Sequence, residues 1–86
     1  MLFRSVVAPD DVLAESLAWA RRLAAGPAYA VRAAKSAIDR GIEVDLETGL
    51  DIERVQFAAL FGTRDQEIGM RSFIENGPGK AEFEGR

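Results

Sequence analysis

Cysteine and histidine are both absent from this chain of 86 residues. Without cysteine there is no disulfide, no thiolate metal site and no cysteine nucleophile, and nothing indicates an oxidising compartment. Without histidine the chain lacks the commonest general base and the commonest metal ligand. A Ser-His-Asp or Cys-His site cannot be built from this chain alone, so we expect no catalytic residue and no metal centre within it.

Clustered basic charge and long apolar runs are also lacking. The chain has 11 basic and 14 acidic residues, a formal charge of −3, whereas nucleic-acid binding needs a clustered basic surface that displaces counterions from phosphate. No apolar run approaches the roughly 20 residues that span a bilayer, and the N-terminus lacks the pattern of a signal peptide. We therefore expect a cytoplasmic protein that binds neither nucleic acid nor membrane.

The start of the chain predicts a strand. MLFRSVV is rich in β-branched and aromatic side chains and stops at Ala8-Pro9. A single strand has nothing to pair with, so it hangs free, lies against helices or belongs to a sheet that is absent here. The predicted organisation is a strand over residues 1–8, a helical domain over 9–75 and an extended tail over 76–86.

Helical spacing of apolar residues predicts about four helices after this strand, and so a mainly α fold. Proline and glycine mark their boundaries, because proline suits a first turn and glycine ends a helix. The predicted spans are Pro9 to Ala25, Pro27 to Gly41, Asp45 to about Gly62, and a last helix that begins at Thr63.

The third predicted helix has apolar residues on two sides. Leu50 and Phe57 follow one side, and Ile52 and Val55 follow another. Such a wide apolar stripe predicts a helix that is buried more than halfway round. The stripe either binds a partner surface or fills the domain's own core, and the sequence favours neither.

The stretch GTRDQEIGMRSF, residues 62–73, is dense in polar residues, which local helix physics explains. Thr63 and Gln66 have the spacing of a reciprocal N-terminal cap. Asp65 and Glu67 lie in the first turn, where acids favour the helix dipole, and Glu67 can pair with Arg71. Capping is therefore favoured over catalysis for these acids, which we expect to be solvated.

The tail contains Gly77-Pro78-Gly79-Lys80, which superficially resembles a phosphate loop. The context is wrong, because these glycines follow a helix instead of leading from a strand into one. Lys80 remains a candidate single charge for a phosphate, with a solvated lysine as the alternative. The tail is too polar to hold itself in place, except at Phe83, which can anchor on another surface.

From Leu2 to Arg86 the chain resembles the C-terminal end of the enoyl-CoA hydratase/isomerase, or crotonase, family. LFRSVV followed by PDD is similar to the family's last core strand, and LAAGPAYAVRAAKSAI to its paired helices. The most specific part runs from Glu53 to Phe73, close to the family pattern E…F…F-x-T-x-D-x-x-E-G-M-x-A-F, and FEGR is similar to the family's ending. Ile68 alters the signature slightly, and Glu75-Asn76-Gly77 replaces the usual Glu-Lys-Arg.

The resemblance implies that the catalytic parts lie before Met1. In the family a larger core supplies two backbone N–H groups as an oxyanion hole and one or two catalytic glutamates. The helical end covers the acyl pocket, contributes to the CoA site and packs subunits into trimers or hexamers. On this basis Phe57 and Phe61 are expected near the acyl or adenine end of a CoA thioester, the substrate, and Lys80 near its phosphates. Phe73 is at least as well explained by core packing.

Two functions follow from these observations. The first is the helical part of an acyl-CoA enzyme of this family, inactive unless a core domain is supplied in trans. The second is a free-standing helical assembly module without a catalytic role. Asn76, where relatives have a lysine, favours the second function because it removes a CoA contact. Neither the reaction type nor the acyl-chain length can be inferred from this end of the chain.

Overall fold

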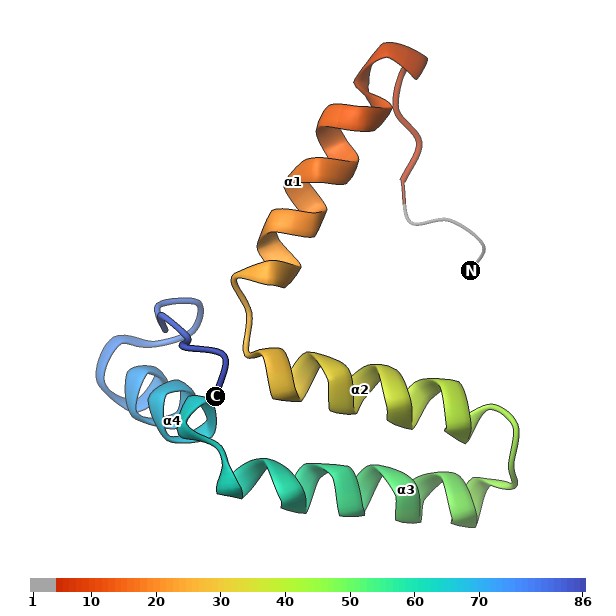
Figure 1. Ribbon diagram of the computed structural model, residues 1–86, viewed down its shortest axis with the longest axis vertical. Helices are drawn as coiled ribbons and strands as arrows, with labels where there is room; N and C mark the ends of the chain where they lie inside the picture. Colours follow the sequence, from red (N-terminus) through yellow and green to blue (C-terminus); the bar gives the residue numbers. More distant parts are fainter. Residues whose placement is uncertain (1–4) are drawn as a thin grey trace.

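A computed structural model describes residues 5–86, and within this part all regular structure is helical (Figure 1). Two short 3₁₀ turns, η1 and η2, precede α1 and α4. The elements are η1 (Pro9–Asp11), α1 (Val12–Ala24), α2 (Ala28–Gly41), α3 (Leu46–Ala59), η2 (Leu60–Gly62) and α4 (Arg64–Asn76). The mainly helical fold is as predicted, and the predicted helix boundaries lie close to the observed ones.

The predicted N-terminal strand is the exception. Its first four residues lie outside the described part of the chain, and residues 5–8 form no strand. Val6 is 83% exposed and Ala8 has an extended backbone. Because residues 5–86 contain no other strand, this segment has no backbone partner there with which to form a ladder.

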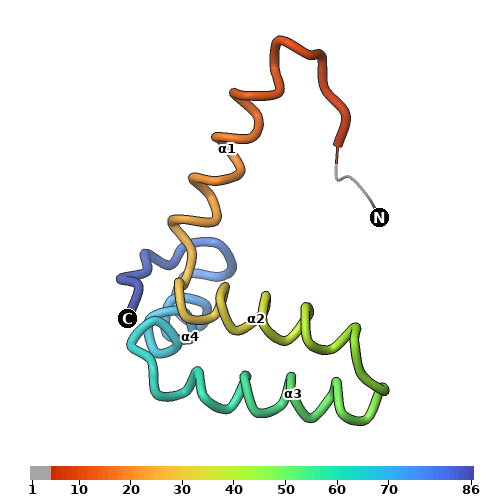
Figure 2. The backbone as a smooth tube through the Cα atoms, turned by 45° about the vertical axis from the view of Figure 1, so that its right-hand side comes forward, coloured from red at the N-terminus to blue at the C-terminus, as the bar shows by residue number. Residues whose placement is uncertain are grey.

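α2 and α3 form an antiparallel hairpin, and α4 lies across its open end (Figures 1 and 2). Asp45 begins α3 as its N-cap, accepting hydrogen bonds from the Thr48 N–H at 3.1 Å and the Thr48 hydroxyl at 2.6 Å. The hydrogen bond from the Thr48 hydroxyl, followed by that from the Thr48 N–H, holds the pKa of Asp45 below its ordinary value of 3.8. The cap fixes where the chain turns from α2 into α3.

α1 points away from the α2–α3 hairpin, and the C-terminal tail folds back beside α4 (Figures 1 and 2). The radius of gyration is 15.7 Å, against about 12 Å for a compact domain of this length. The accessible surface is 7182 Å², whereas a compact monomer of 9.4 kDa would expose about 5000 Å². The helices therefore form an open arrangement.

No apolar side chain among the described residues is buried. On α3, Val55 is 68% exposed and Phe57 63% exposed, and on α1 Leu13 is 71% exposed. Of the two alternatives for the wide apolar stripe of α3, filling the domain's own core does not match this exposure. None of the helices in residues 5–86 has the length and apolar character needed to cross a membrane.

Candidate functional site

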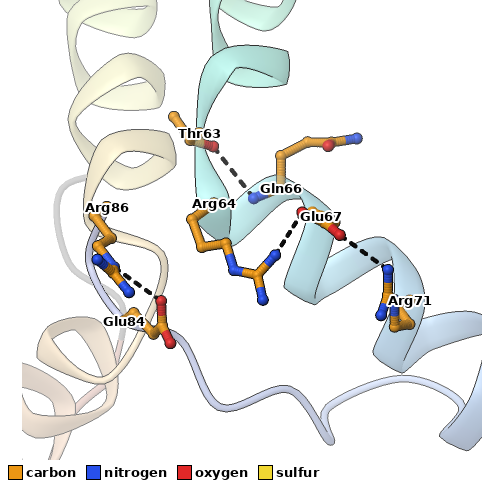
Figure 3. Close-up of polar contacts among 7 residues, drawn as sticks. All are labelled: Thr63, Arg64, Gln66, Glu67, Arg71, Glu84 and Arg86. Carbon is orange, nitrogen blue, oxygen red and sulfur yellow. Dashed lines mark hydrogen bonds and ion pairs between the residues drawn. The ribbon is translucent and has the colours of Figure 1, made fainter.

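The start of α4 shows one half of the predicted reciprocal cap. The Thr63 N–H, which the Gln66 side chain was expected to bind, donates to the Leu60 carbonyl at 3.0 Å instead. Thr63 is the N-cap, and its hydroxyl accepts a hydrogen bond from the Gln66 N–H at 3.2 Å (Figure 3). The same hydroxyl donates to the Leu60 carbonyl at 2.6 Å. Thr63 thus connects η2 to α4 and sets the direction in which α4 leaves the hairpin.

Glu67 pairs with two arginines on the surface of α4. Its carboxylate lies 2.6 Å from Arg64 and 2.9 Å from Arg71, and all three side chains are substantially exposed (Figure 3). The predicted Glu67–Arg71 pair is therefore confirmed. Solvent-exposed pairs of this kind contribute little to stability, so Glu67 is a surface residue with a local role.

Asp65, by contrast, is the one buried residue among those described, at 2% exposure. The prediction that it is a solvated helix-start acid was wrong. Its Oδ1 accepts the Glu84 N–H at 2.7 Å and its Oδ2 accepts the Gly85 N–H at 2.8 Å. The Asp65 N–H in turn donates to the Arg86 carbonyl at 2.8 Å. We call this group of three hydrogen bonds, between Asp65 and residues 84–86, the tail clasp.

Two glycines accommodate the tail. Gly85 has a φ of +79°, a conformation that other residues adopt only with strain. A Cβ on Gly69 would lie 3.3 Å from Cε1 of Phe83, so its absence makes room for the Phe83 ring against α4. The tail is therefore held in place by its backbone as well as by Phe83, and the prediction that its polarity leaves only Phe83 as an anchor was wrong.

An apolar groove of about 270 Å³ lies where α2, α3, α4 and the tail meet. Phe57 and Phe61 line it, with ring centroids 5.4 Å apart in an edge-to-face arrangement. Two of the polar side chains at its edge are engaged within the chain, because Thr63 caps α4 and Asp65 holds the tail. The groove wall is completed by Pro27, Ala30, Leu60, Gln66, Gly69, Met70 and Phe83.

A second cavity with basic side chains lies between the end of α1 and the tail. Arg22 and Lys80 line it, together with Phe73. Gly69 and Phe83 line both this cavity and the apolar groove. The structure thus places Phe57 and Phe61 together in one depression and Lys80 in the neighbouring one, with Phe83 in the wall of both.

The described residues contain no group of three or more acidic, cysteine or histidine side chains that could hold a metal ion. The burial of Asp65, which the sequence did not predict, carried only a weak signal. An acid in the first turn of a helix is usually explained by the dipole. The tail lies 19 to 20 residues further along the chain, and only tertiary structure brings it to that carboxylate.

Comparison with known proteins agrees with this arrangement of helices. The sequence model of the family described as Enoyl-CoA hydratase/isomerase matches residues 2–86, nearly the whole chain. The chain belongs to the enoyl-CoA hydratase/isomerase family. It corresponds to the C-terminal part of the family members it matches, as the resemblance implied.

Two curated relatives illustrate the similarity of this enoyl-CoA hydratase/isomerase chain to longer proteins. A probable enoyl-CoA hydratase of Rhizobium meliloti (strain 1021) is 42% identical over 85 residues, which are 99% of this chain and 32% of that protein. A short-chain-enoyl-CoA hydratase of Clostridioides difficile is 40% identical over 72 residues, 84% of this chain and 46% of that protein.

A solved structure shows the same arrangement of helices. It is that of enoyl-CoA hydratase subunit I from Geobacillus kaustophilus HTA426, with a TM-score of 0.87 and 36% sequence identity. The match covers 94% of this chain and 31% of that one. This chain thus spans about a third of the length of the first relatives it matches, and its helical fold is that of the corresponding part of the family.

Proposed function

We propose that this chain is the helical, pocket-covering and subunit-packing part of an enzyme that acts on acyl-CoA thioesters, and that it is inactive alone. One observation carries the proposal: none of its described apolar side chains is buried. The chain exposes roughly 2000 Å² more surface than a compact monomer of its mass would. That excess is more than the about 800 Å² that each partner buries in a standard protein interface. The family membership supplies the surface that would cover it, a crotonase core.

The paired depressions support a role in contacting the substrate. The apolar groove, lined by Phe57 and Phe61, suits an acyl chain or a stacked base. The neighbouring cavity holds Arg22 and Lys80, and their positive charges suit a phosphate. An acyl-CoA thioester is an anionic molecule with an apolar end, so it presents both kinds of chemistry. No side chain of the chain serves as a catalyst in this proposal.

Split-enzyme complementation tests this function. The chain would be mixed with the core of an enoyl-CoA hydratase that lacks its own helical end, and hydration of crotonyl-CoA followed by the loss of its conjugated thioester absorbance. We expect no hydration with either part alone and measurable hydration with both. Failure of a properly folded core to gain activity, at concentrations that saturate any interaction, would reject the proposal.

A free-standing assembly module is the second candidate, favoured by Asn76 at the position where the family resemblance implies a lysine. It has the same exposed apolar faces but no need for a core. Sedimentation of the chain alone distinguishes the two candidates. A stable helical trimer or hexamer that never complements a core would support the module, whereas a monomer that complements would support the enzyme part.

A further inference from the structure

Asp65 is the only buried acid among the described residues. Its carboxylate binds the end of the chain. A carboxylate is costly to bury unless hydrogen bonds compensate for the water it loses. Each Asp65 oxygen accepts one backbone N–H, from Glu84 at 2.7 Å and from Gly85 at 2.8 Å. Because these donors are backbone groups, the Glu84 side chain is not used by the clasp, and it pairs with Arg86 at 3.0 Å.

The tail clasp also determines where Phe83 lies. Phe83 is the residue immediately before the clasped segment, and its ring contacts the open face of Gly69. It lines both the apolar groove and the basic cavity. Lys80 belongs to the loop between the end of α4 and Phe83, where Gly77 and Gly79 both have positive φ. The clasp and the Phe83 ring therefore fix the far end of a loop whose near end is set by α4.

We propose that Asp65 is a positioning residue whose hydrogen bonds to residues 84–86 hold Phe83 and the Lys80 loop against α4, so that the apolar groove and the basic cavity keep their shapes. The part that concerns substrate rests on the proposed function. The part that concerns the clasp does not, because it can be observed without any ligand.

The first experiment measures the clasp directly in the 86-residue chain by nuclear magnetic resonance. Asp65→Asn replaces one acceptor oxygen by a donor, so one of the two tail N–H groups loses its partner. We expect hydrogen-exchange protection of the Glu84 and Gly85 amides to fall about tenfold or more, as for loss of a charge-assisted hydrogen bond. The nuclear Overhauser contact between Gly69 and the Phe83 ring should weaken in parallel.

Two further variants keep this test decisive. Glu67→Gln is the matched control, because Glu67 lies two positions after Asp65 in the same first turn of α4 and its substitution breaks only exposed ion pairs. It should leave the tail amides and the Phe83 contact unchanged. Gly85→Ala opens the clasp from the tail side, since alanine disfavours a φ of +79°. Because this change lies outside α4, it still tests the clasp if Asp65→Asn disrupts that helix. Retention of both signals in Asp65→Asn or in Gly85→Ala would overturn the clasp.

The second experiment places the same variants in the complemented enzyme. Loss of a positioning residue should raise KM for crotonyl-CoA by about tenfold and change kcat much less, because the substrate surface loosens while the core is intact. Lys80→Ala should raise KM less in the Asp65→Asn background than in the parent. Equal effects of Lys80→Ala in both backgrounds would reject the positioning role. Absence of hydration in the parent would reject the proposed function, and the amide measurements would still decide the clasp.

Discussion

The two ends of the described chain differ in what holds them in place. At the α4 end, the tail returns to its own helix, where the buried Asp65 carboxylate, the Thr63 cap and the Phe83 ring against Gly69 hold it in place. At the α1 end, the helix extends away with Val12, Leu13 and Leu23 each more than half exposed. Contacts within the chain thus stabilise the tail at the α4 end, whereas the apolar side chains of α1 are left for another surface.

The physical basis of this difference is directionality. Hydrogen bonds to Asp65 require donors at fixed distances, which the tail backbone of the same chain supplies. The apolar residues of α1 require only removal from water, which any complementary apolar surface provides. A region held by directional bonds should therefore tolerate isolation, whereas a region that depends on apolar burial should become well packed only when that burial occurs.

Deleting residues 84–86 should have the largest effect on stability. It leaves the Asp65 carboxylate without its two backbone donors, and we expect a loss of about 2–4 kcal/mol around α4. Hydrogen exchange of the α4 amides would measure it. The double variant Glu84→Ala with Arg86→Ala keeps the backbone and removes only an exposed ion pair, so it should cost under about 1 kcal/mol. Equal costs for the two changes would contradict the clasp.

Removing the cap of α4 should have the next largest effect. Thr63→Ala deletes the acceptor for the Gln66 N–H and the donor to the Leu60 carbonyl. We expect a loss of about 1 kcal/mol, measured as faster exchange of the first amides of α4. Thr63→Ser retains the hydroxyl and should lose much less. A cost for serine as large as that for alanine would show that the methyl group, and not the cap, matters here.

Acidification should loosen the start of α3 selectively. The folded-state pKa of Asp45 lies below its ordinary value of 3.8, so its cap contributes stability above that value and loses it as pH falls through the folded-state pKa. We expect the Thr48 amide resonance to move and its exchange to accelerate there. Asp45→Asn caps without titrating and should remove this transition. A titration curve unchanged in that variant would assign the transition to another acid.

Polar substitution on α1 should have the smallest effect in the isolated chain. Leu13 is 71% exposed, so Leu13→Ser should change stability by less than about 0.5 kcal/mol, measured by urea unfolding. In the complementation assay the same variant should weaken association with the core, because there the side chain would be buried. Leu60→Ser, in the wall of the apolar groove, provides the contrast. Equal losses of stability for these two substitutions in the isolated chain would contradict the distinction between α1 and the region around α4.

The sequence by itself determined the local features of this protein. The spacing of apolar residues, with proline and glycine at the boundaries, predicted the four helices. The caps at Thr63 and Asp45 each bind the backbone N–H three positions further along the chain. Such features depend on neighbours within one turn, so a reading of adjacent residues can find them. The resemblance to the enoyl-CoA hydratase/isomerase family also followed from the sequence, since its motifs lie in these same stretches.

Tertiary structure decided the remainder. A strand was predicted over residues 1–8 because its composition suits one, yet residues 5–8 form none, since a strand exists only by pairing with another. Asp65 has the composition of an ordinary helix-start acid, and it became the buried partner of the tail only because the chain returns 19 to 20 residues later. The placement of Phe57 and Phe61 in one depression and Lys80 in the next was likewise set by how the helices and tail pack, and whether these residues meet substrate stays a prediction.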